Sequence, residues 1–209
     1  MTNSHKEFSK TNLLFEDLDD DPVLQFAKCL KKYLELDVSE SIAVNFSTID
    51  KSGYPSSRIV FMRLFDENGF VFFTNYDSNK GEELRKNNKA AMLFYWPELE
   101  IQIRIWGKTE KVDAVISDNY FKTRPAGSQA GAWISRQSKE IESRLSLEKM
   151  HQTFLKNTEN KIIPRPEFWG GYRLIPDKYE FWQGRPNRLH DRFLYLKLEN
   201  SWEIKRLAP

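Results

Sequence analysis

The chain has 209 residues, of which 40% are hydrophobic, 14% aromatic and 30% charged, which is the balance of an ordinary globular domain with a sizeable core. The 32 basic and 30 acidic residues leave a net charge of +2. This small excess gives no bulk attraction to nucleic acid, so any anion site must be a local cluster.

Several kinds of site are excluded early. Cys29 is the single cysteine, so neither an intrachain disulfide nor a cysteine-based metal site can form. The histidines His5, His151 and His190 form no HxxxH or HxH pair, and we expect no metal. The first residues lack the apolar core of a signal peptide, and no apolar run approaches the ~20 residues of a membrane span. We therefore expect a cytoplasmic protein with no membrane contact.

The first part of the chain predicts an arm and a helix. Residues 1–20 are polar and charged and are typical of a mobile arm, which leaves 21–209 as a single domain. Asp21 is a good N-cap and Pro22 suits the first helical position. Apolar residues at three- and four-residue spacing then predict a helix through about residue 36.

Strand patterns dominate the rest of the chain. We expect strands at 42–49, 57–65, 70–75, 89–96, 99–112, 170–176, 178–183 and 192–198, with 202–209 closing the chain. Residues 66–69 are a hairpin turn. Helices are expected at 78–87, 117–123 and 138–156, with a loop of small residues at 124–136. About eight short strands without regular strand–helix alternation predict a mainly β fold, an antiparallel barrel with peripheral helices.

Two basic groups lie in the first two thirds of the chain. Arg58 and Arg63 are five residues apart and would face opposite sides of a regular strand. Lys80 opens a predicted helix, where free backbone N–H groups favour a phosphate, although its position alone favours a solvated lysine at a helix start. In YFKTRPAGS, the side chains of Tyr120, Arg124 and Ser128 have the donors to bind a phosphate, unless Arg124 is simply a solvated residue at a helix end.

A third group lies near the C-terminus, in the segment EFWQGRPNRLHDRF. It places three arginines around His190, and an anionic ligand would relieve their mutual repulsion. The alternative is a structural histidine.

This C-terminal segment, with the terminal WEIKRLAP, resembles the signature of the pyridoxine/pyridoxamine 5′-phosphate oxidases. FVFFTNYDSNKG, LFYWPELEIQIRIWGKTEKV, YFKTRPAGSQAGAWISRQS and PRPEFWGGYRL are similar to the same family in the same order, so the resemblance covers about residues 12–209. It implies an FMN-binding split barrel of antiparallel Greek-key type. It also implies a homodimer with FMN at the subunit interface, and oxidation of pyridoxine or pyridoxamine 5′-phosphate to pyridoxal 5′-phosphate with oxygen reduced to hydrogen peroxide.

The resemblance also assigns roles to individual residues. The FMN contacts that it implies are Arg58, Ile59, Val60, Phe61, Met62, Arg63, Phe73, Thr74, Asn79, Lys80, Gln102, Gln137, Ser138, Trp182 and Arg192. The substrate contacts that it implies are Arg63, Tyr120, Arg124, Ser128, Arg188, Leu189 and His190. Among these, Arg188 and His190 are the residues expected to act in catalysis.

Three positions depart from the family pattern. Arg63 replaces a lysine that contacts substrate phosphate, and its planar fork reshapes that contact. Asn79 replaces an arginine beside the FMN phosphate. In the arm, His5 and Phe8 stand where the family has an RxxY element that covers substrate. These departures leave two alternatives open: an FMN oxidase for another substrate, such as a phenazine-type intermediate, and a non-catalytic flavin-binding protein.

Overall fold

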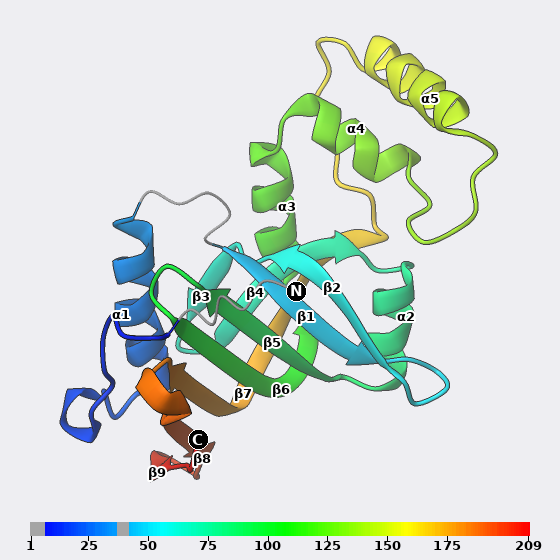
Figure 1. Ribbon diagram of the computed structural model, residues 1–209. Helices are drawn as coiled ribbons and strands as arrows, with labels where there is room; N and C mark the ends of the chain where they lie inside the picture. Colours follow the sequence, from blue (N-terminus) through cyan, green and yellow to red (C-terminus); the bar gives the residue numbers. More distant parts are fainter. Residues whose placement is uncertain (1–6, 37–41) are drawn as a thin grey trace.

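The computed structural model describes residues 7–36 and 42–209. Within these residues a nine-stranded antiparallel sheet curls into a half-barrel, with helices at its ends (Figure 1). The strands are β1 (Ala43–Ile49), β2 (Pro55–Phe61), β3 (Leu64–Asp66), β4 (Gly69–Asn75), β5 (Lys89–Trp96), β6 (Ile101–Lys111), β7 (Trp169–Gln183), β8 (Asp191–Lys197) and β9 (Trp202–Arg206). The predicted mainly β fold with peripheral helices is confirmed.

The order of the strands across the sheet is β2-β1-β5-β6-β7-β4-β3, and β8 and β9 extend it from β7. β7 is therefore the central strand, and it pairs with β4, β6 and β8. It runs from the end of the molecule where α3 and α4 lie to the end where α1 and β8 lie (Figure 1). Side chains at the two ends of β7 consequently belong to different regions of the molecule.

The helices are α1 (Pro22–Leu34), α2 (Asn79–Lys86), α3 (Ala114–Thr123), α4 (Ala126–Ile134) and α5 (Arg144–Asn157), with short 3-10 helices at Phe15–Asp17 and Pro186–Arg188. Asp21 caps α1 as predicted, because its carboxylate accepts a hydrogen bond from the N–H of Val23 (2.8 Å). The ring of Phe26 then packs into the barrel against Phe70 (centroids 4.9 Å apart) and Phe94 (5.0 Å). No helix among these residues is long and apolar enough to cross a membrane.

Several predicted elements were wrong. The segment 124–136 is not a loop throughout, since α4 occupies most of it. The long helix begins at Arg144 and not at residue 138, because Ser143 caps it and Ser138 has a left-handed backbone (φ 72°). The two strands expected at 170–176 and 178–183 are one strand, β7, which continues through Pro176.

Candidate functional site

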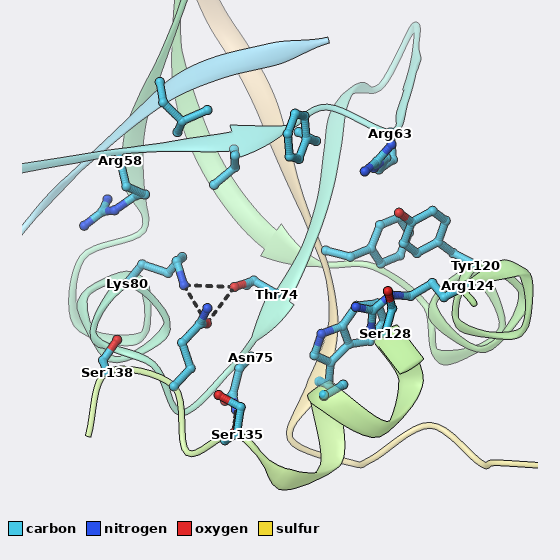
Figure 2. Close-up of a pocket in the computed structure, with 18 of the residues that line it drawn as sticks. Arg58, Arg63, Thr74, Asn75, Lys80, Tyr120, Arg124, Ser128, Ser135 and Ser138 are labelled. Atoms are coloured by element: carbon cyan, nitrogen blue, oxygen red, sulfur yellow. Dashed lines mark hydrogen bonds between the residues drawn. The ribbon is translucent and has the colours of Figure 1, made fainter. Parts of the chain in front are cut away.

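A cavity of about 870 Å³ opens between β2, β4 and the helices α2, α3 and α4. This volume is in the usual range for a small-molecule site. Figure 2 shows its two ends, with Arg58, Lys80 and Ser138 on one side and Arg63, Tyr120, Arg124 and Ser128 on the other. The lining includes these predicted site residues: Arg58, Ile59, Val60, Phe61, Arg63, Phe73, Thr74, Asn79, Lys80, Tyr120, Arg124, Ser128, Gln137 and Ser138.

The first end of the cavity centres on Lys80. Ser78 caps α2, so Lys80 lies in the first turn and its ammonium reaches back over β4. Its Nζ donates to Thr74 Oγ1, Ser78 Oγ and Gln137 Oε1, each at 2.9 Å. Burial, and then the charge of Arg58, lower the pKa of Lys80 to about 8. An anion bound beside it would offset both effects, so this end suits a phosphate.

Arg58 is held by neighbours on one side. Its guanidinium donates to Glu83 Oε2 (3.0 Å), Thr48 Oγ1 (2.5 Å) and Ser56 Oγ (2.5 Å). Glu83 also accepts from the Thr48 hydroxyl at 2.5 Å, so carboxylate, hydroxyl and guanidinium form one network. The side chains of Arg58 and Glu83 are only 21% and 11% exposed, which fixes the position of the guanidinium at the cavity wall.

The segment before α5 closes this end. Ser138 is held in the left-handed region, and its Oγ accepts a hydrogen bond from the backbone N–H of Asn79 at 3.3 Å. Gln137 accepts from Lys80 and from Thr74 (3.3 Å). Backbone and side-chain donors from α2, β4 and this segment therefore meet at one point.

The other end of the cavity is an aromatic stack flanked by two arginines. The rings of Phe73 and Tyr120 lie 4.0 Å apart and nearly parallel (13°), and Trp169 continues the stack 5.7 Å from Phe73. The guanidinium of Arg124 lies 4.6 Å from the Trp169 ring, and that of Arg63 lies 5.9 Å from the Tyr120 ring. Both guanidiniums therefore lie against rings of this aromatic stack.

Neither guanidinium is neutralised by the protein. Within residues 7–36 and 42–209, Arg63 and Arg124 form no ion pair, and the buried Nη1 of Arg124 has no hydrogen-bond partner. Burial is the main cause that lowers the pKa of Arg124, and the charge of Arg63 adds to it. A buried donor without a partner is costly, and an anionic group between the two arginines would supply the acceptor.

The expected opposition of Arg58 and Arg63 does not hold. The strand predicted at 57–65 is interrupted, because β2 ends at Phe61 and β3 begins only at Leu64. The break buries Met62 in the core, where it is 3% exposed and does not line the cavity. It also allows both arginines to line one cavity from its two ends.

A second cluster lies at the far end of β7. Gln102, Trp182 and Arg192 are direct neighbours across β6, β7 and β8. The imidazole of His190 lies 4.6 Å from the Trp182 ring, and its Nδ1 accepts a hydrogen bond from the backbone N–H of Arg185 (3.0 Å). The neutral imidazole therefore carries its proton on Nε2. Burial, followed by the charge of Arg188, lowers the pKa of His190.

Two of the three arginines in this segment are neutralised within the protein, contrary to the expectation that an anionic ligand relieves their repulsion. Arg185 pairs with Asp191 (3.2 Å), and Arg192 pairs with Glu180 (2.9 Å), so their repulsion is relieved within the protein. Arg188 is the arginine of the three that forms no ion pair in the described part of the chain. It has a left-handed backbone (φ 61°), and the neighbouring Leu189 is 68% exposed.

The two clusters do not meet within one chain. Trp169, at the start of β7, lines the cavity, whereas Trp182 lies near the end of the same strand. At a rise of about 3.3 Å per residue, roughly 40 Å of strand separates them. Gln102, Trp182, Arg188, His190 and Arg192 are accordingly absent from the cavity lining.

Sequence reasoning missed several residues of the cavity. Trp169, Ser135 and Asn75 line it, and Glu83 holds Arg58. Trp169 lies in PRPEFWGGYRL, whose resemblance to the family was the available signal. Glu83 gave no signal, because a glutamate in a charged helix is usually solvated.

Comparison with known proteins gives the affiliation of the chain. The family model described as pyridoxamine 5′-phosphate oxidase matches residues 30–155, and the one described as the pyridoxine 5′-phosphate oxidase C-terminal dimerisation region matches residues 169–209. The chain belongs to the pyridoxamine 5′-phosphate oxidase family. The resemblance read from its motifs is thereby confirmed.

Full-length relatives support the same affiliation. The pyridoxine/pyridoxamine 5′-phosphate oxidase of Nostoc punctiforme is 49% identical over 205 residues, covering 98% of this chain and 96% of the relative. The protein of the same name from Ralstonia pickettii is 47% identical, covering 97% of this chain and 96% of the relative.

Two crystal structures share the fold. PhzG from Burkholderia lata, in complex with tetrahydrophenazine-1-carboxylic acid, is 30% identical with a TM-score of 0.89 and covers 95% of this chain and 99% of its own. A pyridoxamine 5′-phosphate oxidase-related, FMN-binding protein from Nostoc punctiforme is 17% identical with a TM-score of 0.70, covering 88% of this chain and 95% of its own. The second likeness shows the fold alone.

Proposed function

We propose that this protein is an FMN-dependent oxidase that converts pyridoxine 5′-phosphate or pyridoxamine 5′-phosphate to pyridoxal 5′-phosphate. The observation that carries the proposal is a single cavity with two separate anion-binding ends joined by an aromatic wall. A reaction between a phosphate-bearing cofactor and a phosphate-bearing substrate needs two such ends. The relatives named for this activity match nearly the whole chain.

The residues at the Lys80 end fit the FMN phosphate. Lys80 and Arg58 supply positive charge, while Ser138 adds a hydroxyl and the start of α2 adds backbone donors. The lowered pKa of Lys80 indicates a buried cation that lacks a full counter-charge. Exposed apolar side chains on β2, including Ile59 at 62% and Phe61 at 39%, give a surface for a flat ring.

The residues at the Arg124 end fit the substrate phosphate. Arg63 and Arg124 supply two guanidiniums that have no carboxylate partner in the described part of the chain, and Tyr120 and Ser128 supply hydroxyls. When bound, FMN supplies the acceptor for hydride from the substrate and passes the electrons to oxygen. Arg188 and His190 orient the pyridine ring, and the Nε2–H of His190 donates a hydrogen bond to a ring substituent.

We also propose that each site is completed by a second copy of the chain. Gln102, Trp182, Arg188, His190 and Arg192 are too far from the cavity of their own chain to act there. In a two-fold dimer, the cluster of one chain closes the cavity of the other. The match to a C-terminal dimerisation region, which includes β8 and β9, supports this arrangement.

Subunit complementation tests the shared site. Lys80→Ala damages the cavity and His190→Ala damages the loop, so a mixed dimer contains one intact site only if each site uses both chains. Co-expression of differently tagged variants and isolation of the mixed dimer should restore about half of the wild-type activity per dimer. A mixed dimer as inactive as both parents would show that each chain completes its own site.

The activity itself is tested by aerobic turnover. The FMN-loaded protein should convert both B6 phosphates to the aldehyde, with one hydrogen peroxide formed per aldehyde. Absence of turnover with both substrates, in a protein that binds FMN, would refute the proposed substrate.

A second candidate substrate class is favoured by one observation. The PhzG structure, which contains a tetrahydrophenazine carboxylic acid, matches 95% of this chain with a TM-score of 0.89. An oxidase of a phenazine-type acid would need one carboxylate site at Arg63 and Arg124. Two guanidiniums suit a phosphate dianion better, and competition between the two substrates in one assay separates the candidates.

A further inference from the structure

The N-terminal arm contacts the Trp182–His190 cluster through a buried carboxylate. Glu100 lies in the turn between β5 and β6 and is only 1% exposed. Its Oε2 accepts hydrogen bonds from the backbone N–H groups of Ser9 (2.9 Å) and Lys10 (3.0 Å), about 90 residues away in sequence. Hydrogen bonds to an ionised carboxylate are about twice as strong as neutral ones. The carboxylate of Glu100 therefore binds backbone N–H groups of the arm, and these two hydrogen bonds do not require particular side chains at positions 9 and 10.

The backbone of Glu100 binds the end of β7. Its carbonyl accepts from the N–H of Gly184 (2.8 Å) and from Nε2 of Gln183 (3.2 Å), both next to Trp182. Glu100 also has a left-handed conformation (φ 57°), which is costly for a residue other than glycine. One residue thus connects the arm to the end of β7.

The two hydrogen bonds place Phe8 on the second cluster. Its ring meets the rings of Trp182 and His190 edge to face, with centroids 5.5 Å and 5.7 Å away. The ring lies over Gly184, where an added Cβ would be 2.6 Å from Phe8 Cγ. A side chain at position 184 would push Phe8 off the two rings. The neighbouring N–H of Leu13 donates to Asp191 Oδ2 (3.2 Å), which continues the attachment along the arm.

We infer that Glu100 is a positioning residue, which anchors the arm so that Phe8 holds the imidazole of His190 against Trp182, with Gly184 as the seat of the Phe8 ring. The kinetic part of this inference rests on the proposed function. Loss of the anchor frees Phe8, and His190 then loses one wall of its ring site. Binding of FMN at the Lys80 end is unaffected, because neither Glu100 nor Phe8 lines the cavity or is among the residues proposed to contact FMN from the second copy of the chain.

Trypsin cleavage tests the anchor without any assay of activity. Glu100 binds the backbone N–H of Lys10, next to the peptide bond that trypsin cleaves, and release of the arm exposes that bond to the protease. In the FMN-loaded full-length protein, Glu100→Ala should raise the cleavage rate after Lys10 about tenfold, and Glu100→Gln severalfold. Glu98→Gln is the matched control, because Glu98 lies in the same turn and its carboxylate binds Tyr33 and not the arm. Equal cleavage of wild type and Glu100→Ala would overturn the anchor.

A double-mutant cycle tests the positioning role. Glu100→Ala and Phe8→Ala should each lower kcat/KM for the B6 phosphates about tenfold with FMN affinity unchanged, and the double variant should be no worse than either single one. Additive losses would show that Glu100 acts independently of Phe8, which overturns the inference. A higher kcat/KM in Phe8→Ala would show that the arm obstructs the site, which overturns it as well.

Gly184→Ala tests the contact between Phe8 and Gly184 by changing the glycine instead of the ring. It should reproduce the kinetic loss of Phe8→Ala, because the added methyl group occupies the space of the ring. If wild type turns over neither substrate, the proposed function fails, whereas the trypsin experiment still decides whether Glu100 anchors the arm.

Discussion

In the cavity, Arg63 and Arg124 line the same end with no carboxylate partner in the described part of the chain (Figure 2), whereas near His190 both Arg185 and Arg192 have one. The two regions contain similar residues but differ in how their charge is neutralised. The cavity is suited to anions, because Lys80 and Arg124 are half-buried and neither they nor Arg63 form an ion pair in the described part of the chain. In the loop, Asp191 and Glu180 neutralise Arg185 and Arg192, which therefore fix the loop, and Arg188 and His190 are the residues that we propose to meet the ligand.

This difference predicts separate effects on binding and on turnover. Variants at the Lys80 end should change FMN affinity, those at the Arg124 end should change KM, and those in the loop should change turnover with FMN retained.

The largest effect is expected in the loop. His190→Ala should lower kcat/KM by about tenfold to a thousandfold, because it removes a hydrogen-bond donor at the substrate ring. Flavin content should stay at the wild-type value, since we expect His190 to contact the substrate ring and not the FMN. Arg188→Ala should behave in the same way. Flavin occupancy and steady-state kinetics measured on the same preparations check both, and loss of flavin from either variant would contradict the division of roles.

The next effect concerns the cofactor end. Lys80→Ala should weaken FMN about ten- to a hundredfold, since it removes a charge-assisted contact of ~1.5–3 kcal/mol. Lys86→Ala, on an exposed position of the same helix, is the matched control and should bind FMN normally. Titration of the apo protein by quenching of FMN fluorescence measures both. Equal affinities would remove Lys80 from the phosphate site.

A smaller effect is expected for Arg63. Arg63→Ala should raise KM for both B6 phosphates by about tenfold with little change in FMN affinity, because Arg124 still supplies one guanidinium. Arg63→Lys should keep KM near the wild-type value, since it keeps the charge. Unchanged kinetics in the alanine variant would show that Arg63 does not contact the substrate.

The sequence predicted the elements that rest on local signals. The cap of α1 at Asp21 and the hairpin turn before Gly69 follow from residue types, and both are present. α4 was missed because Gly127 and Gly131 lower helix propensity, and packing of α4 against α5 overrides that preference. β7 was split in the prediction because Pro176 usually ends a strand. Opposite Pro176 the register of β6 shifts next to Gly107, and this irregularity accommodates the proline.

The residue types of the site could likewise be predicted from the sequence, but their arrangement could not. Residue types identified Lys80, Arg124 and His190, because charge and donor chemistry are visible in a sequence. Their distribution over two ends of the molecule was not visible, since it depends on the length and pairing of β7. The partners of the arginines were equally hidden: Glu180 neutralises Arg192 on the neighbouring strand, 12 residues away in sequence, and Glu83 in α2 holds Arg58 in β2, 25 residues away.

The smallest predicted effect is the dependence of FMN binding on pH. Burial and the charge of Arg58 lower the pKa of Lys80 to about 8, well below its ordinary value of 10.5. Below pH 8 the ammonium is charged in the free protein, so a phosphate dianion binds without proton uptake. Above pH 8 the amine is neutral in the free protein but protonated beside the bound phosphate, so binding must take up a proton. The Kd for FMN should therefore be flat below pH 8 and rise by up to about tenfold per pH unit above it. Lys80→Arg should abolish this rise, because arginine stays charged throughout the range. The same rise in Lys80→Arg, measured by fluorescence titration between pH 7 and 9.5, would assign the titration to another group.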